Sequence, residues 1–254
     1  MRTRSLIGGG IALLLLFLAT QAPAWLLSEA LGKLAPNNVM LQQVQGSVWS
    51  GRAQAQARLP QGTMLDLGRV QWRLQPWTLL TGKLSAKIDA PELPLGGRLQ
   101  TSVAVGFDRA LTLKNLQAQL PAALVAKFVP QISIMEPGGT LELTSDSLAL
   151  KANNAQGKLS AIWRGFTTKM SKVNPLGDYK LDALLGAGPV NFKLSSPAGP
   201  LLIDGSGSWS TATRLNFQGS ARLAPGAPAE LAGLIRLFGR DQGGGTYAIN
   251  LNNL

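Results

Sequence analysis

The chain has 254 residues, of which 45% are hydrophobic and 15% charged, and a formal net charge of +11. It contains no cysteine and no histidine. These absences exclude disulfides, a Ser-His-Asp triad and the side chains that most often bind zinc, copper or haem. The length is sufficient for one hydrophobic core, and a single all-β unit of this size is common.

The N-terminal segment predicts export across a membrane. Arg2 and Arg4 precede the apolar run Leu6–Ala19, and positive charge before such a run keeps the N-terminus in the cytoplasm. Two interpretations of the segment remain open. The 23 residues of Ser5–Leu27 are long enough for a transmembrane anchor. Ala22-Pro23-Ala24, in contrast, resembles the small-residue cleavage site of a signal peptide.

The anchored interpretation divides the chain into three parts. They are a cytoplasmic tip with a transmembrane anchor (1–27), a juxtamembrane linker that starts as a short helix (28–38), and a periplasmic β-domain (39–254). A weak internal repeat indicates a further division of the β-domain: Trp-x-Gly occurs at Trp49 and again at Trp163. Its two similar β-units would be 39–150 and 151–254.

The region after Val39 is typical of β-structure. Short runs of alternating polar and apolar residues, separated by Gly, Pro and Asn, predict half-buried antiparallel strands. The fold class is therefore all-β, with a curved antiparallel sheet, and the pattern leaves open whether that sheet stays open, closes on itself or packs on a second sheet. The clearest runs are Arg69–Leu74, Lys83–Asp89, Leu99–Val105, Leu141–Leu143, Val190–Leu194, Leu215–Phe217 and Tyr247–Leu251.

Two stretches interrupt this alternation and predict short helices. Pro121–Phe128 opens with a proline, which suits a first helical turn. Pro228–Phe238 places Leu231, Leu234 and Ile235 on one face, as in an amphipathic helix. We expect both helices to cover ends or edges of the sheet, because uncovered edges promote aggregation.

No residue set points to catalysis or to a cofactor. Asp178 and Asp182 would lie on one face of a strand, about 13 Å apart, which is too far for the carboxyl pair of a glycoside-cleaving enzyme. Gly243-Gly244-Gly245 lacks the Gly-Lys-Ser/Thr of a phosphate loop. We therefore assign no catalytic, cofactor-binding or metal-binding residue. Five tryptophans are expected to pack in the sheet's apolar core or to line a groove for lipid or a partner: Trp49, Trp72, Trp77, Trp163 and Trp209.

Several stretches together resemble the type II secretion system protein N family. They are Val48-Trp49-Ser50-Gly51, Val70–Trp77 with Leu80-Thr81-Gly82, Asn174–Tyr179, and a Gly-x-Tyr-x-Ile strand around Tyr247. Their order and spacing agree with that family over nearly the whole chain. The residues expected to serve as structural turn and core positions of the family are Trp49, Gly51, Trp72, Pro76, Pro175 and Gly177.

The resemblance implies an accessory, non-catalytic component of the type II secretion system. It would be held in the inner membrane by one span, with its body in the periplasm, and would bind other proteins of the apparatus without a cofactor. Export makes nucleic acid an improbable partner despite the basic charge. The alternative is a periplasmic lipid-bridging protein of the AsmA type that contacts phospholipid. A cell-wall hydrolase would need a carboxylate pair that the sequence does not nominate.

Overall fold

A computed structural model describes residues 21–34, 39–59, 62–106, 110–128, 133–151, 154–210 and 214–252. The apolar run Leu6–Ala19, which carries the predicted anchor, lies outside these residues. Within the part of the chain that is described, no helix is long and apolar enough to cross a membrane.

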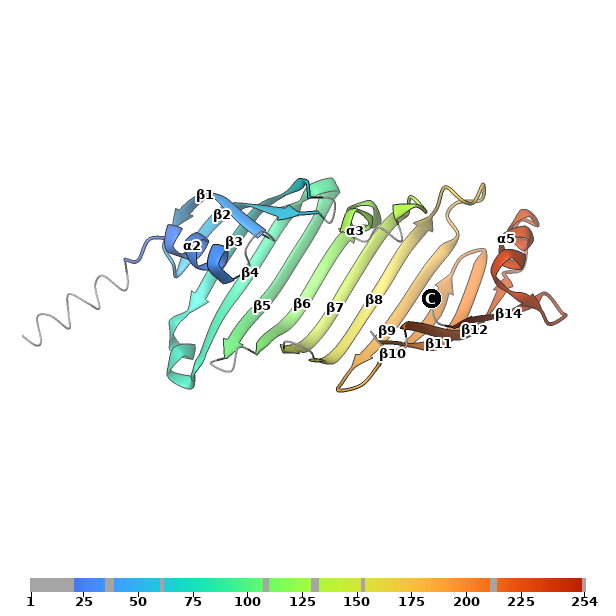
Figure 1. The fold of residues 1–254 in the computed structure, drawn as a ribbon. Helices are drawn as coiled ribbons and strands as arrows, with labels where there is room; N and C mark the ends of the chain where they lie inside the picture. Colours follow the sequence, from blue (N-terminus) through green and yellow to red (C-terminus); the bar gives the residue numbers. More distant parts are fainter. Residues whose placement is uncertain are drawn as a thin grey trace, which may run out of the picture.

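One antiparallel sheet contains all fourteen strands of the described residues (Figure 1). The strands lie side by side in chain order, except that β14 lies between β12 and β13. The prediction of an antiparallel all-β body is confirmed, and each of the seven clearest alternating runs lies in a strand. The strands are β1 (Val39–Gly46), β2 (Ser50–Arg58), β3 (Met64–Gln75), β4 (Lys83–Leu93), β5 (Gly97–Gly106), β6 (Leu111–Pro121), β7 (Gly138–Lys151), β8 (Asn154–Thr167), β9 (Gly177–Leu185), β10 (Val190–Ala198), β11 (Leu201–Ser210), β12 (Arg214–Leu223), β13 (Arg240–Asp241) and β14 (Thr246–Asn252).

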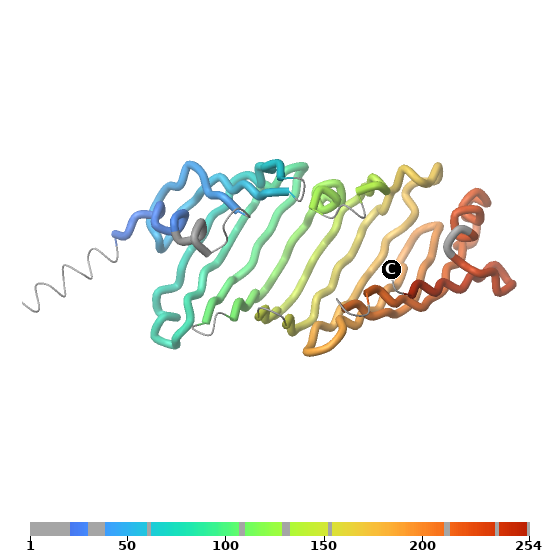
Figure 2. The backbone as a smooth tube through the Cα atoms, in the orientation of Figure 1, coloured from blue at the N-terminus to red at the C-terminus, as the bar shows by residue number. Residues whose placement is uncertain are grey.

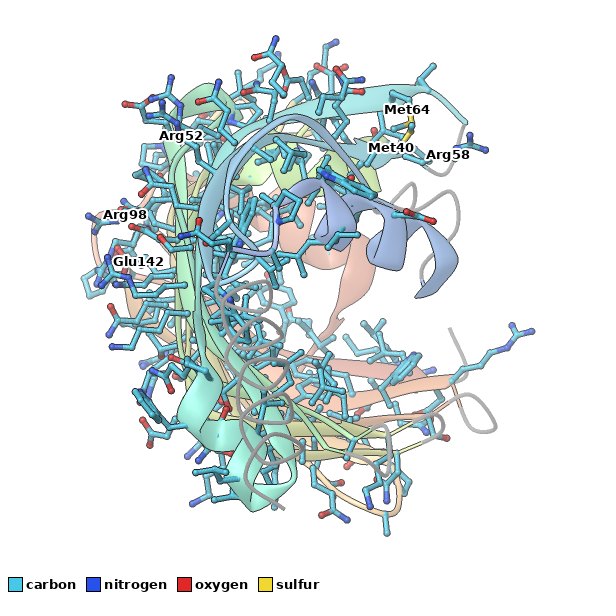
Figure 3. The ribbon with its side chains drawn as sticks, turned by 90° about the vertical axis from the view of Figure 1, so that its left-hand side faces the viewer. Met40, Arg52, Arg58, Met64, Arg98 and Glu142 are labelled. Atoms are coloured by element: carbon cyan, nitrogen blue, oxygen red, sulfur yellow. The ribbon has the colours of Figure 1, made fainter. Side chains whose placement is uncertain are left out.

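The sheet stays open, with β1 at one edge and the two-residue strand β13 at the other. The tube in Figure 2 follows this single layer from the blue strands to the red ones. Viewed from its β1 end, the layer curves around the helices, and Arg52, Arg98 and Glu142 point away from the enclosed side (Figure 3). We call the enclosed side the inner face and the other the outer face.

Helices cover only parts of this sheet. Helix α2 packs against β1, α3 against β6 and β7, and α5 against β12 and β14. The two helices predicted after Pro121 and Pro228 are confirmed, but α3 lies at the long rim near the middle of the sheet (Figure 1). Helix α2 contains the residues 28–34 that were predicted to be helical. The bounds are α2 (Trp25–Leu34), α3 (Ala122–Phe128), α5 (Glu230–Phe238) and the 3-10 helices η1 (Pro76–Thr81) and η2 (Pro94–Gly96).

The predicted boundary between two β-units, after residue 150, falls at the β7–β8 hairpin. These two strands pair from Gly138↔Thr167 to Lys151↔Asn154, so the sheet is continuous there. Two separate clusters of buried side chains nevertheless lie one near each end of the sheet. The division into two units stays a prediction.

Candidate functional site

The inner face is apolar and the outer face polar, because side chains alternate along each strand. One row across β4 to β7 consists of Ala86, Val103, Leu113 and Leu148, which are register partners in that order. The adjacent row, on the outer face, consists of Lys87, Ser102, Lys114 and Ser147. The periodicity of the sequence therefore determines the chemistry of each face.

The middle of the inner face is only partly covered. Ala86, Val103 and Leu113 are half-buried, and the facing pair Leu84 and Val105 is exposed. Contiguous exposed apolar surface of this kind marks sites that bind a protein, a membrane or a ligand. The inner face is therefore the candidate functional site.

A first cluster closes the β1 end of the inner face. Ala24 packs there with Ala53, Trp72 and Leu74. The indole Nε1 of Trp72 donates a hydrogen bond to the carbonyl oxygen of Val48, at 3.1 Å, so the buried ring keeps a partner for its one polar atom. Trp72 thus fixes the loop before β2 against β3.

Four of the six predicted family positions lie in or beside this cluster. Trp49 packs against it, and its carbonyl oxygen accepts a hydrogen bond from the backbone N–H of Leu74, at 2.7 Å. Gly51 is the register partner of Trp72 and leaves the space that the indole occupies. Pro76 is the first residue of η1, where its missing N–H costs nothing.

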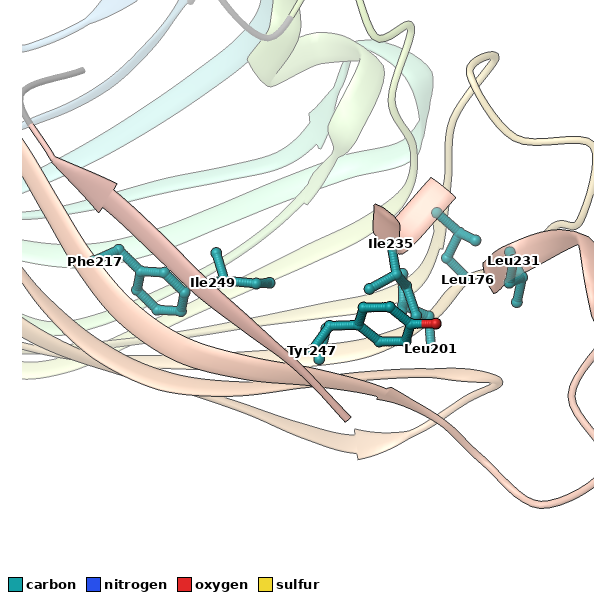
Figure 4. Close-up of a cluster of buried hydrophobic side chains, with 8 residues drawn as sticks. Leu176, Leu201, Phe217, Leu231, Ile235, Tyr247 and Ile249 are labelled. Carbon is teal, nitrogen blue, oxygen red and sulfur yellow. The ribbon is translucent and has the colours of Figure 1, made fainter. Parts of the chain in front are cut away.

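A second cluster closes the other end of the inner face, beneath α5 (Figure 4). Leu231 and Ile235 of the helix meet Phe217, Tyr247 and Ile249 of the strands. The helix is amphipathic, and its Glu230 and Arg236 lie in the first and last turns, where their charges complement the helix dipole. This end of the inner face holds the larger of the two clusters.

The remaining two family positions lie at this second end and not with the first four. Pro175 follows Asn174 through a cis peptide bond, and Leu176, the next residue, is fully buried. Gly177 has φ +148°, and a Cβ there would meet the carbonyl oxygen of Ala198 at 2.7 Å. Glycine at position 177 therefore lets the chain pass close to Gly199, next to the buried Leu176.

An apolar cavity of about 460 Å³ opens beside this second cluster. Side chains of β9 to β12, β14 and α5 form most of its wall, together with Met135 and Met170 from two loops. This cavity could not be predicted from the sequence, because alternation shows which residues share a face but not where that face is left uncovered. Representative lining residues are Leu181, Phe192, Leu194, Ile203, Phe217 and Ile249.

Polar groups near this end are paired. The hydroxyl of Tyr179 donates a hydrogen bond to the carbonyl oxygen of Leu201, at 3.0 Å, and burial raises the pKa of this phenol above its usual value. Asp182, on the outer face, accepts hydrogen bonds from Lys180 and Ser160, which together lower the pKa of its carboxyl group. Asp178 accepts a hydrogen bond from the backbone N–H of Gly165, at 2.7 Å.

The tryptophans divide into buried and exposed groups. Trp72 is buried, and Trp49 and Trp163 are half-buried, as core packing requires. Trp77 and Trp209 are exposed, so the expectation of core packing is wrong for these two. Trp77 lies on η1, outside the strands.

The fold and this face define a class of protein: a long, single-layer antiparallel sheet whose apolar inner face is the candidate binding surface. The family described as "Type II secretion system (T2SS), protein N" matches residues 37–250, and the chain belongs to this family. The Type II secretion system protein N of Aeromonas hydrophila is 28% identical over 243 residues, which cover 92% of this chain and 91% of that protein. No solved structure matches the chain.

Proposed function

We propose that this chain is an accessory, non-catalytic component of the type II secretion system. Its N-terminal segment holds it in the inner membrane, and its sheet lies in the periplasm and binds other proteins of the apparatus. Family membership supports the assignment to secretion. The exposed start of the edge strand β1, at Val39 and Met40, is the observation that carries the binding role.

The residues around Ala22 support a retained anchor. The backbone N–H of Val48 donates to the carbonyl oxygen of Ala22 at 2.8 Å, and that of Ala24 donates to Gly46 at 3.2 Å. Ala24 is also fully buried in the first cluster. Ala22-Pro23-Ala24 is therefore part of the folded domain, whereas signal-peptide cleavage at this motif would separate it from the domain.

Strand β1 offers an edge to which another chain can add a strand. Among the described strands it pairs with β2 alone, and an edge strand presents N–H and C=O groups on its other side to which a further strand can pair. The regular part is Val39–Gln42, because a bulge between Gln42 and Gln45 interrupts the register. Val39 and Met40 are exposed there, which suits recognition by strand addition.

Proline substitutions at Met40 and Leu41 test this edge. Successive N–H groups of a strand alternate in direction, so one variant removes an outward N–H while the other removes a bond to β2. Proline is tolerated where the N–H points out of the sheet. We expect one variant to keep the wild-type denaturation midpoint yet lose binding to apparatus proteins by about tenfold, the effect of about 1.4 kcal/mol.

The measurement is photo-crosslinking in secreting cells. The crosslinker is placed at Val39, and at Gln100 on the outer face of β5 as the control position. Adducts are identified by mass spectrometry. Secretion-apparatus adducts from Val39 that disappear in the folded proline variant support edge pairing. Unchanged adducts in both proline variants contradict it.

A second candidate function, lipid binding, is favoured by the open inner face and its apolar cavity. Cavities of 300–1,000 Å³ with mostly apolar walls are typical of small-molecule sites. An acyl chain has no polar group to satisfy, so the apolar wall of this cavity suits it. In this function the sheet carries phospholipid along its inner face.

The matched substitutions Leu181→Asp and Leu184→Asp test lipid binding. Both residues belong to β9, but Leu181 lines the cavity and Leu184 is exposed. A charge in an apolar cavity disfavours an acyl chain. We expect Leu181→Asp to reduce phospholipid co-purified with the full chain at least about fivefold, while Leu184→Asp leaves it unchanged. Lipid binding is rejected if the two variants co-purify with equal amounts of phospholipid, or if the wild-type chain co-purifies with none.

A further inference from the structure

The 3-10 helix η1, between β3 and β4, presents apolar side chains to solvent. Trp77 is 79% exposed and Leu80 is 88% exposed, and Leu79 is also exposed. No residue of η1 is buried. Such a group of large apolar side chains on one tip is more than the scattered exposure normal for a soluble surface.

The polar groups of the same tip are bonded internally. The hydroxyl of Thr78 donates to the carbonyl oxygen of Gln75 and accepts from the backbone N–H of Ser85. The hydroxyl of Thr81 donates to the carbonyl oxygen of Thr78, at 2.7 Å, and the N–H of Gly82 donates to Leu79. The two threonine hydroxyls of the tip therefore do not depend on water, which suits an environment of low polarity.

The strands that carry this tip are basic where they approach it. From Arg69 to Gln75 and from Lys83 to Ile88 every charged residue is basic, and the nearest of them are Arg73, Lys83 and Lys87. An apolar tip with cations behind it complements the interface of a bilayer that contains anionic lipid.

The tip lies at the end of the sheet where the chain enters it (Figure 1). Ala22 is bonded to Val48, and the next residue, Trp49, is bonded to Leu74, two residues before η1. The start of α2 adds exposed Trp25 and Leu26 at the same end. Tryptophan is the side chain most typical of a membrane interface.

We propose that η1 is a second membrane contact, which inserts Trp77 and Leu80 into the interface of an anionic bilayer and fixes the orientation of the sheet. This contact rests on the proposed anchoring, because the anchor brings the β1 end of the sheet to the membrane. Two separate contacts restrict rotation of the domain about its anchor. The sheet then presents its edge β1 at a defined angle to neighbouring proteins.

Single-cysteine variants test the contact, since the chain has no cysteine of its own. The full chain is reconstituted in vesicles of phosphatidylethanolamine and phosphatidylglycerol with brominated acyl chains, and each thiol carries a bimane fluorophore. Leu80→Cys reports on the tip and Leu14→Cys on the anchor. Ile134→Cys is the matched control, because Ile134 is an equally apolar side chain that is 82% exposed.

We expect bromine to quench the probe at position 80 about threefold more than the probe at position 134, as for a group at the interface. Equal quenching at these two positions, with strong quenching at position 14, overturns the contact while the anchor stands. Quenching at position 80 without quenching at position 14 supports the contact and rejects the proposed anchoring. No quenching at either position overturns both.

The lipid charge provides an independent check. Replacing Arg73 and Lys83 by Gln, or using phosphatidylcholine vesicles, should reduce quenching at position 80 about twofold or more, because each basic residue near the surface adds to the attraction. Quenching at position 14 should stay the same. If quenching at position 80 is identical in neutral vesicles, the assignment to anionic lipid is wrong.

Discussion

Leu231→Ala should lower the free energy of unfolding of the full chain in detergent micelles by about 2–5 kcal/mol, the usual cost of truncating a fully buried leucine. Leu231 is 1% exposed and packs α5 onto the second cluster. Because the surrounding strands are held by the sheet, they cannot collapse into the space that is left. Guanidinium denaturation followed by tryptophan fluorescence measures the change.

Leu184→Ala is the control for this prediction, since it removes the same atoms from a side chain that is 53% exposed on β9. We expect its effect to stay within about 0.5 kcal/mol. If the two alanine variants have the same midpoint, α5 does not stabilise the sheet as its burial indicates.

Gly51→Ala should destabilise the β1 end of the sheet by about 1–3 kcal/mol, the range for overpacking a core. A Cβ at this position overlaps the ring of Trp72 and lies 2.6 Å from the carbonyl oxygen of Gln45. The indole must move, and its hydrogen bond to Val48 is then lost. The same denaturation experiment, together with the near-ultraviolet circular dichroism of the tryptophans, detects the change.

Gly186→Ala supplies the comparison, because a Cβ at Gly186 meets no atom within 4 Å. We expect it to leave both the midpoint and the near-ultraviolet signal unchanged. A wild-type signal in Gly51→Ala would show that the loop before β2 adapts without moving Trp72.

Much of the fold follows from the sequence because polar and apolar residues alternate along parts of most strands. Arg69–Leu74 and Tyr247–Leu251 each place apolar side chains at every second position, so their strand character and buried face are defined locally. The apolar face of the helix after Pro228 is equally local, since Leu231 and Ile235 are one turn apart.

The parts that could not be predicted depend on contacts between distant segments. Alternation does not say whether a second layer covers the apolar face, so the open sheet was only one of three alternatives and the cavity beside Phe217 was not expected. The sequence assigns the last residues before α2 to the predicted transmembrane anchor, yet Ala24 is buried against Trp72. Trp77 lies in the same stretch as Trp72, and nothing in the local sequence distinguishes the two residues. Only the path of the chain through η1 leaves Trp77 exposed.

The order of the strands has a consequence for how the molecule is made. From β1 to β12 each strand pairs with the one synthesised just before it, and such short-range topologies fold quickly. A chain delivered N-terminus first can therefore add strands one at a time to a growing edge. Strand β14 pairs with both β12 and β13, so β13 can join the sheet only after β14, which follows it in the chain, has paired with β12.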